Sequence, residues 1–193
     1  FRIKAMSKKA RAVEIVKNQI TTKCVIFDVK SEDGLAISDT QNDILKIAVI
    51  ERHHSTGRIG MGFAKGFGLK KGAIASTVCH DAHNLIVVGT NDEDMLVAAE
   101  CLRKCGGGFA AAAGGKPLGV LPLPVAGLMS PDSAVKVASE YDTLNRKVKK
   151  LGSAVDDPFL TLSFLSLSVV PTLRMEDRGL LDVEKEKFIP LFV

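Results

Sequence analysis

The sequence has no tryptophan, one tyrosine and only four histidines among its 193 residues. Carbohydrate platforms and single-strand nucleic-acid surfaces stack their ligands on aromatic rings, so the shortage of Trp and Tyr argues against both kinds of site. The sequence also lacks an apolar run of the roughly 20 residues that a membrane-spanning helix needs. We therefore expect neither a nucleic acid nor a membrane as a partner.

The four cysteines form no CxxC motif and no regular disulfide framework. No signal-peptide pattern is visible either, and together these features favour a reducing, cytoplasmic setting. The net charge of +4 is spread along the chain, whereas a dedicated nucleic-acid binder gathers its lysines and arginines on one face or in a tail. Cys101 and Cys105 could ligate a metal from one helix face, but small apolar packing residues are the commoner reading of such a pair.

Runs of strand length rich in β-branched residues dominate the first 90 residues, with turn-forming residues between them. This pattern predicts strands over residues 20–29, 44–52, 59–67, 72–78 and 85–89. Residues 109–113 and 118–123 predict a hairpin around Gly114 and Gly115, and the apolar tail from 156 to 193 predicts short irregular pieces.

Capping residues and the spacing of apolar residues predict two helices. The clearest spans are 92–104, with Asn91 as N-cap and Gly106 in the left-handed position after it, and 131–151, with Ser130 as N-cap. Strands first and helices later predict an α+β fold with a mixed, largely antiparallel sheet and a few packed helices. No domain boundary is evident, so residues 1–193 are expected to form a single domain.

All four histidines lie in two short motifs, ERHHSTG at 51–57 and CHDAHN at 79–84. Each motif follows a predicted strand, and if those strands are neighbours both motifs reach the same rim of the sheet. Imidazole and carboxylate groups are common ligands of Zn, Mn and Fe, and they also polarise substrates. The pattern predicts a shared functional site, with surface or hydrogen-bonded core histidines as the alternative. The candidate metal ligands are His53, His54, His80, His83 and Asp81.

Other chemistries find less support. The glycine-rich stretch 60–66 is one residue off the dinucleotide pattern and has no strand-to-helix junction after it, while 114–117 lacks the Ser or Thr of a phosphate loop. Cys79 and His80 are direct neighbours, which on a strand would point to opposite faces and make a poor nucleophile–base pair.

The two histidine motifs belong to a longer set of similar segments. ERHHSTG is similar to an ERHHGTG segment, and HDAHN to an HDSHN segment, of bacterial and archaeal adenine deaminases. Further similar segments occupy residues 49–60, 62–77, 87–95, 121–130, 157–167 and 188–193. On these motifs the chain resembles that family over nearly its whole length. It departs from the pattern at Ser55, where the family usually has Gly, and at Ala82, where it usually has Ser.

The resemblance implies an enzyme of the amidohydrolase superfamily that converts adenine and water to hypoxanthine and ammonia in purine salvage. Its chemistry would lie in a barrel with a divalent metal (Mn, Fe or Zn), an HxH pair and a catalytic Asp. This sequence has no HxH and is too short for such a barrel. The resemblance therefore implies the C-terminal domain alone, and a start at Phe1 without Met fits a piece of a longer polypeptide.

The expected roles are to pack on the N-terminal barrel of the same protein, to support a homo-oligomer, and to contribute the histidine cluster near the active site or as an accessory metal site. The isolated chain is then expected to be inactive toward adenine. Two other hypotheses stay open at this point. One is a stand-alone metal-binding module without catalysis, and the other is a small independent hydrolase with Asp81 or Glu51 as its general base.

Overall fold

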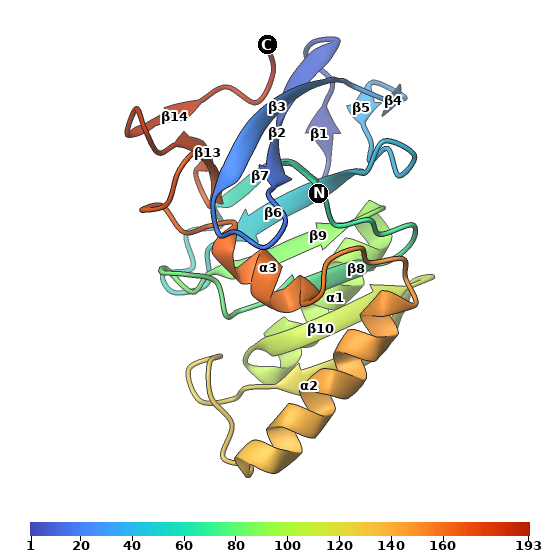
Figure 1. The fold of residues 1–193 in the computed structure, drawn as a ribbon, viewed down its shortest axis with the longest axis vertical. Coiled ribbons are helices and arrows are strands. Elements are labelled where there is room, and N and C mark those ends of the chain that lie inside the picture. Colours follow the sequence, from blue (N-terminus) through green and yellow to red (C-terminus); the bar gives the residue numbers. More distant parts are fainter.

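An eight-stranded sheet runs through the molecule in the order β11–β10–β8–β9–β6–β7–β2–β3 (Figure 1). All its neighbouring strands are antiparallel except β2 and β7, which are parallel, so the predicted largely antiparallel α+β fold is confirmed. The computed structural model describes residues 1–193. The strands are β2 (Lys9–Ile15), β3 (Thr22–Asp28), β6 (Ile44–Ile50), β7 (Ile59–Lys65), β8 (Ala73–Ser76), β9 (Leu85–Gly89), β10 (Gly108–Ala113) and β11 (Lys116–Pro122).

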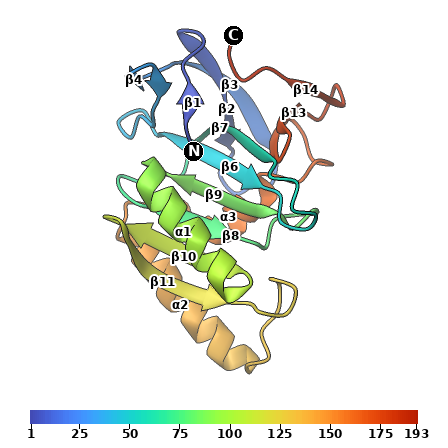
Figure 2. The same ribbon diagram turned by 180° about the vertical axis from the view of Figure 1, so that it is seen from behind.

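Helices cover both faces of this sheet. Helix α1 (Asp92–Cys105) lies on the face seen in Figure 2, whereas α2 (Ala134–Lys149) and α3 (Pro158–Phe164) lie on the face seen in Figure 1. The α1 side of the sheet is rich in alanine at alternate positions, which lets the helix approach closely. The alanines of this layer are Ala48, Ala73, Ala75, Ala110 and Ala112. The larger core, of 22 buried residues, lies on the opposite face.

The first helix matches its prediction closely. The side chain of Asn91 accepts a hydrogen bond from the amide of Asp94, and Gly106 takes the left-handed conformation with φ 83° after the last turn. The second helix begins later than predicted. Ser133 rather than Ser130 is the N-cap, because the Ser130 hydroxyl accepts from the amide of Asp132 in a preceding turn. No helix of the structure combines the length and the hydropathy needed to cross a membrane.

The tail from residue 156 is more regular than predicted. It contains α3, capped by Asp157, and a three-stranded sheet of β12 (Leu173–Glu176), β13 (Gly179–Asp182) and β14 (Lys187–Ile189). These strands are only three or four residues long, so they leave little alternating pattern to read in the sequence. A second small sheet, near the N-terminus, consists of β1 (Ile3–Lys4), β5 (Leu35–Ala36) and β4 (Ser31–Glu32).

The last residues return to the first long strand. The amide of Arg11 donates to the carbonyl of Leu191 at 2.8 Å, and the amide of Val193 donates to the carbonyl of Lys9 at 3.0 Å. The hydroxyl of Ser7 donates to the carbonyl of Val193 at 2.7 Å. The apolar tail is thus packed against β2, as the composition of residues 188–193 predicts.

Candidate functional site

The two histidine motifs lie at the same end of the large sheet. Strands β6 and β8 both pair antiparallel with β9, so they run in the same direction and finish at the same end. They are not direct neighbours, because β9 lies between them. Residues 51–58 follow β6, and residues 77–84 connect β8 to β9. We refer to these two loops and their four histidines as the histidine site.

Direct contacts join the two loops. The ring Nε2 of His53 donates to the carbonyl of Ala82 at 2.7 Å. The guanidinium Nε of Arg52 donates to the carbonyl of His83 at 2.6 Å. Within each loop the rings are near one another: the centroids are 6.4 Å apart for His53 and His54, and 5.7 Å apart for His80 and His83. The histidine motifs therefore meet in space.

The five predicted metal ligands do not form a cation site in this arrangement. No three His, Cys, Asp or Glu side chains are placed so that they could hold one ion. The Nε2 of His53 is engaged with a carbonyl, the ring of His80 packs on Phe164 with centroids 4.9 Å apart, and His54 is exposed. Metal binding therefore stays a prediction for the five candidate ligands, His53, His54, His80, His83 and Asp81. As they are placed, their side chains do not surround one ion.

Glu51 organises the first loop through hydrogen bonds. Its Oε1 accepts from the amides of His53 at 2.5 Å and His54 at 2.7 Å. Its Oε2 accepts from the amide and the hydroxyl of Thr56, at 3.0 and 2.9 Å. The bond from the Thr56 amide is the largest of the effects that lower the pKa of Glu51 from 4.5 to about 2. The carboxylate thus shapes the loop, and its strongly lowered pKa makes it a weak general base near neutral pH.

This arrangement predicts a pH-dependent effect of Glu51→Gln. Because the folded pKa is lowered, the ionised carboxylate favours the folded state above pH 4.5, and this contribution disappears as the pH falls toward about 2. Glutamine cannot ionise. The urea midpoint of the variant should therefore lie below that of the wild type near pH 7, and the gap should shrink toward about pH 3. A gap that stays constant over this range would contradict the carboxylate's role.

Arg52 connects three loops. In addition to its bond with His83, its Nη2 donates to the carbonyl of Ala126 at 2.7 Å, in the turn after β11. Thr77 strengthens the same junction, because its hydroxyl donates to the carbonyl of Gly127 at 2.6 Å and accepts from the amide of Gly108 at 2.7 Å. Arg52 was missed as a site residue. Its position next to the two histidines was the only signal, since its acceptors are backbone carbonyls that no motif reveals.

The turn between β12 and β13 forms another wall of the site. Arg58 pairs with Asp177 at 2.7 Å, which ties this turn to the first histidine loop. Burial, followed by the charges of Asp177 and Asp81, raises the pKa of Glu176 to about 7. The turn is far from the histidine motifs along the chain, and no sequence pattern joins it to them.

Two neighbouring polar atoms of the second loop lack hydrogen-bond partners. They are the Nδ1 of His83 and the Oδ1 of Asn84, and Asn84 is only 4% exposed. Burial is the main cause that lowers the pKa of His83, and the charges of His80 and Arg52 add to it. His83 is therefore a neutral imidazole near neutral pH, with a free ring nitrogen that can donate or accept a proton. Buried polar atoms usually have partners, and an ordered water is the usual partner where the protein supplies none.

Cys79 is no nucleophile in this structure. Its side chain is fully buried, and burial raises the pKa of the thiol to about 12. Reactive cysteines instead carry a lowered pKa and some exposure. The thiol packs in the core below the site, in agreement with the poor geometry expected for a Cys79–His80 pair.

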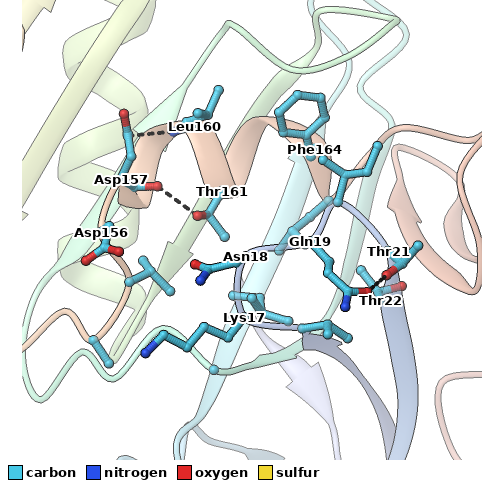
Figure 3. A pocket seen from close by; sticks show the side chains of 17 residues that line it. Lys17, Asn18, Gln19, Thr21, Thr22, Asp156, Asp157, Leu160, Thr161 and Phe164 are labelled. Carbon is cyan, nitrogen blue, oxygen red and sulfur yellow. Dashed lines mark hydrogen bonds between the residues drawn. The ribbon is translucent and has the colours of Figure 1, made fainter.

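Two hollows in the surface are lined by none of the four histidines. The first, of about 540 Å³, lies between the β2–β3 turn and α3, and Figure 3 shows the side chains that line it. Much of its polar lining is already paired: Thr21 donates to Gln19, the Thr161 hydroxyl donates to the Asp157 carbonyl, and the Asp157 carboxylate caps α3. None of the predicted site residues lines this hollow.

The second hollow, of about 550 Å³, adjoins the histidine site because Glu51, Arg52 and Ser55 are part of its lining. Helix α1 supplies another wall through Leu96, Ala99 and Leu102. We refer to it as the α1 cavity.

Comparison with known proteins agrees with the motifs. Residues 19–187 match the family model described as "Adenine deaminase C-terminal domain". The chain is 52% identical over 192 residues to the adenine deaminase of Desulfatibacillum aliphaticivorans, and 48% identical over 192 residues to adenine deaminase 2 of Carboxydothermus hydrogenoformans. The adenine deaminase of Methanothrix thermoacetophila is 47% identical over 193 residues.

These matches cover 99–100% of this chain but only 34% of each relative. The chain thus spans about a third of the length of the curated relatives that it matches. The family model covers most of the chain, and the similar motifs extend along it, so the match decides the family. The chain belongs to the adenine deaminase C-terminal domain family.

Proposed function

We propose that this chain is the C-terminal domain of an enzyme that converts adenine and water to hypoxanthine and ammonia. The domain packs on a catalytic barrel, supports a cytoplasmic homo-oligomer that acts in purine salvage, and turns its histidine site toward the barrel's active site. The observation that carries this proposal is the meeting of the two histidine motifs at one end of the sheet, beside two unpaired polar atoms.

In this proposal the metal and the residues of this chain have separate roles. The resemblance assigns a divalent metal (Mn, Fe or Zn) to the barrel, where it would activate a water molecule. The residues of this chain do other work: His83 presents a neutral imidazole, and Arg52 fixes the loop that carries it. The lack of a three-donor group in this arrangement favours this reading over a stand-alone metal-binding module.

The first test uses the isolated chain. Ammonia release from adenine should be absent with Mn, Fe or Zn added, because the groups expected to activate water lie in the barrel. Sustained release would show that this chain contains a complete active site and would overturn the proposed separation of roles. If the chain retained one equivalent of metal after dialysis, the metal-binding module would be favoured instead.

The second test uses a full-length adenine deaminase that carries this sequence as its C-terminal domain. His83→Ala should lower kcat/KM for adenine by at least about tenfold, since a positioned acid–base group contributes about 10²–10⁴-fold and a positioning group less. Val135→Ala is the control, because Val135 lies on α2, outside the histidine site, and its side chain is 81% exposed. Equal activities of the two variants would contradict a role for the histidine site, and an intact enzyme without adenine deaminase activity would contradict the proposed function itself.

A further inference from the structure

The α1 cavity has an apolar interior and a charged rim. Ile50, Leu85 and Leu102 contribute buried or half-buried apolar surface, and the Arg103–Glu100 ion pair on α1 lies at the rim. Two apolar side chains that line the cavity remain open to solvent: Leu96 is 55% exposed and Ile59 is 46% exposed. These two side chains give the cavity an exposed apolar edge.

The exposure of Leu96 is not required by the helix. The apolar stripe of α1 that faces the sheet consists of Met95, Ala98, Ala99 and Leu102, all of them buried. Leu96 lies about 100° round the helix from Met95, beside this stripe and over the cavity. Leu96 does not pack in the core beneath α1, so its exposed side chain is available for contact with a partner.

We propose that the α1 cavity, with Leu96 and Ile59, is the surface on which the rest of the adenine deaminase chain docks. This inference rests on the proposed function and adds to it the identity of the contact face. Two observations favour this occupant over an unrelated partner.

The first observation is the place of Phe1. Phe1 lines the cavity, and its carbonyl accepts from the Nζ of Lys46 at 3.2 Å. The relatives are about three times as long as the match, and the matched family is their C-terminal domain. A segment of such a chain that comes before residue 1 would pass the wall of the cavity that Phe1 lines.

The second observation is continuity with the histidine site. Glu51, Arg52 and Ser55 belong to both surfaces, so a body that fills the cavity also covers the loop of His53 and His54. The hollow between the β2–β3 turn and α3 lacks both properties. It also exposes apolar side chains, Ile20 and Leu160, but neither Phe1 nor any residue of the two histidine loops lines it.

Thiol labelling of a full-length adenine deaminase with this domain tests the proposal. Leu96→Cys places a thiol at the cavity, and Val135→Cys is the matched control because Val135 is an apolar residue on α2 that is 81% exposed. The native enzyme would be treated with a maleimide, the urea-unfolded enzyme would give the reference rate, and peptide mass mapping would separate these thiols from the natural cysteines. We expect at least tenfold slower labelling at position 96 than at position 135 in the native enzyme.

Equal labelling at the two positions, or slower labelling at position 135, would overturn the docking surface. Adenine deaminase activity, measured on the same preparations, distinguishes a failure of the docking surface from a failure of the proposed function. Active enzyme with an accessible position 96 would contradict the docking surface alone. A full-length protein with no activity toward adenine would contradict the proposed function, whatever the labelling shows.

Discussion

Replacing Arg174 with leucine is expected to lower the free energy of unfolding by roughly 3–5 kcal/mol. Arg174 is 0% exposed, and its guanidinium donates to the backbone carbonyls of Val170, Phe164, Ile20 and Pro171 at 2.6–3.0 Å. Leucine would remove the side-chain donor that the carbonyls of Val170 and Ile20 share. Burial lowers the pKa of Arg174 to about 10, so the side chain stays charged at neutral pH and makes strong bonds.

Thermal unfolding of the chain measures this effect. The expected loss corresponds to a fall in Tm of roughly 10 °C for a domain of this size. Arg178→Leu is the control, since Arg178 is exposed and its guanidinium lies 5.0 Å from the centroid of the Phe188 ring. If the two variants unfolded at the same temperature, Arg174 would not hold these segments together.

The second large effect is expected at Gly60. A Cβ at this position would lie 1.8 Å from the carbonyl oxygen of Glu176 and 2.9 Å from the amide nitrogen of Gly179. Both atoms are backbone, so the β12–β13 turn must move away from β7. Gly60→Ala should therefore cost about 3 kcal/mol or more, at the upper end of the range for overpacked sites.

The matched control lies two residues further on the same strand. A Cβ at Gly62 would meet the Sδ of Met175 at 3.0 Å, and a flexible thioether can adjust. Gly62→Ala should thus cost clearly less than Gly60→Ala in urea unfolding. Because the displaced turn carries Asp177, the partner of Arg58, Gly60→Ala should also loosen the first histidine loop, measured as faster amide exchange over residues 51–58. Equal losses for the two variants would contradict direct backbone packing at Gly60.

Much of the fold could be predicted because its signals are local. The strands over residues 44–50 and 59–65 are runs of apolar or small residues bounded by turns, and α1 has both an N-cap and a glycine after its last turn. The start of α2 was wrong by three residues because two serines compete to cap it, and only the structure shows that Ser130 is used elsewhere. The tail escaped prediction because its strands obtain their stability from tertiary packing.

From the sequence, the site could be predicted only through residue types that are typical of functional sites, such as histidine. Four histidines in two motifs predicted one shared site, and the structure shows that the two loops that carry them are in contact. The contribution of Arg52 depends on its contacts with the carbonyls of His83 and Ala126. The pKa of Glu176 is raised by its burial and by the charges of Asp177 and Asp81. Asp81 is far from Glu176 in the sequence and is brought near it only by the fold. Such effects arise between residues that are distant in the sequence and close in space, and the pattern of apolar and polar residues along the chain does not predict them.

The return of residues 190–193 to strand β2 has a consequence for biosynthesis. Ser7 and Val193 are 186 residues apart in sequence and joined by a hydrogen bond, so the pairing of residues 191–193 with β2 forms only after almost the whole segment has been synthesised. Closing a contact over such a distance costs chain entropy and slows folding. Until then Ala10 and Ala12 of β2 lack the cover that Leu191 and Phe192 give them in the folded domain, and such transiently exposed apolar surface is prone to aggregate.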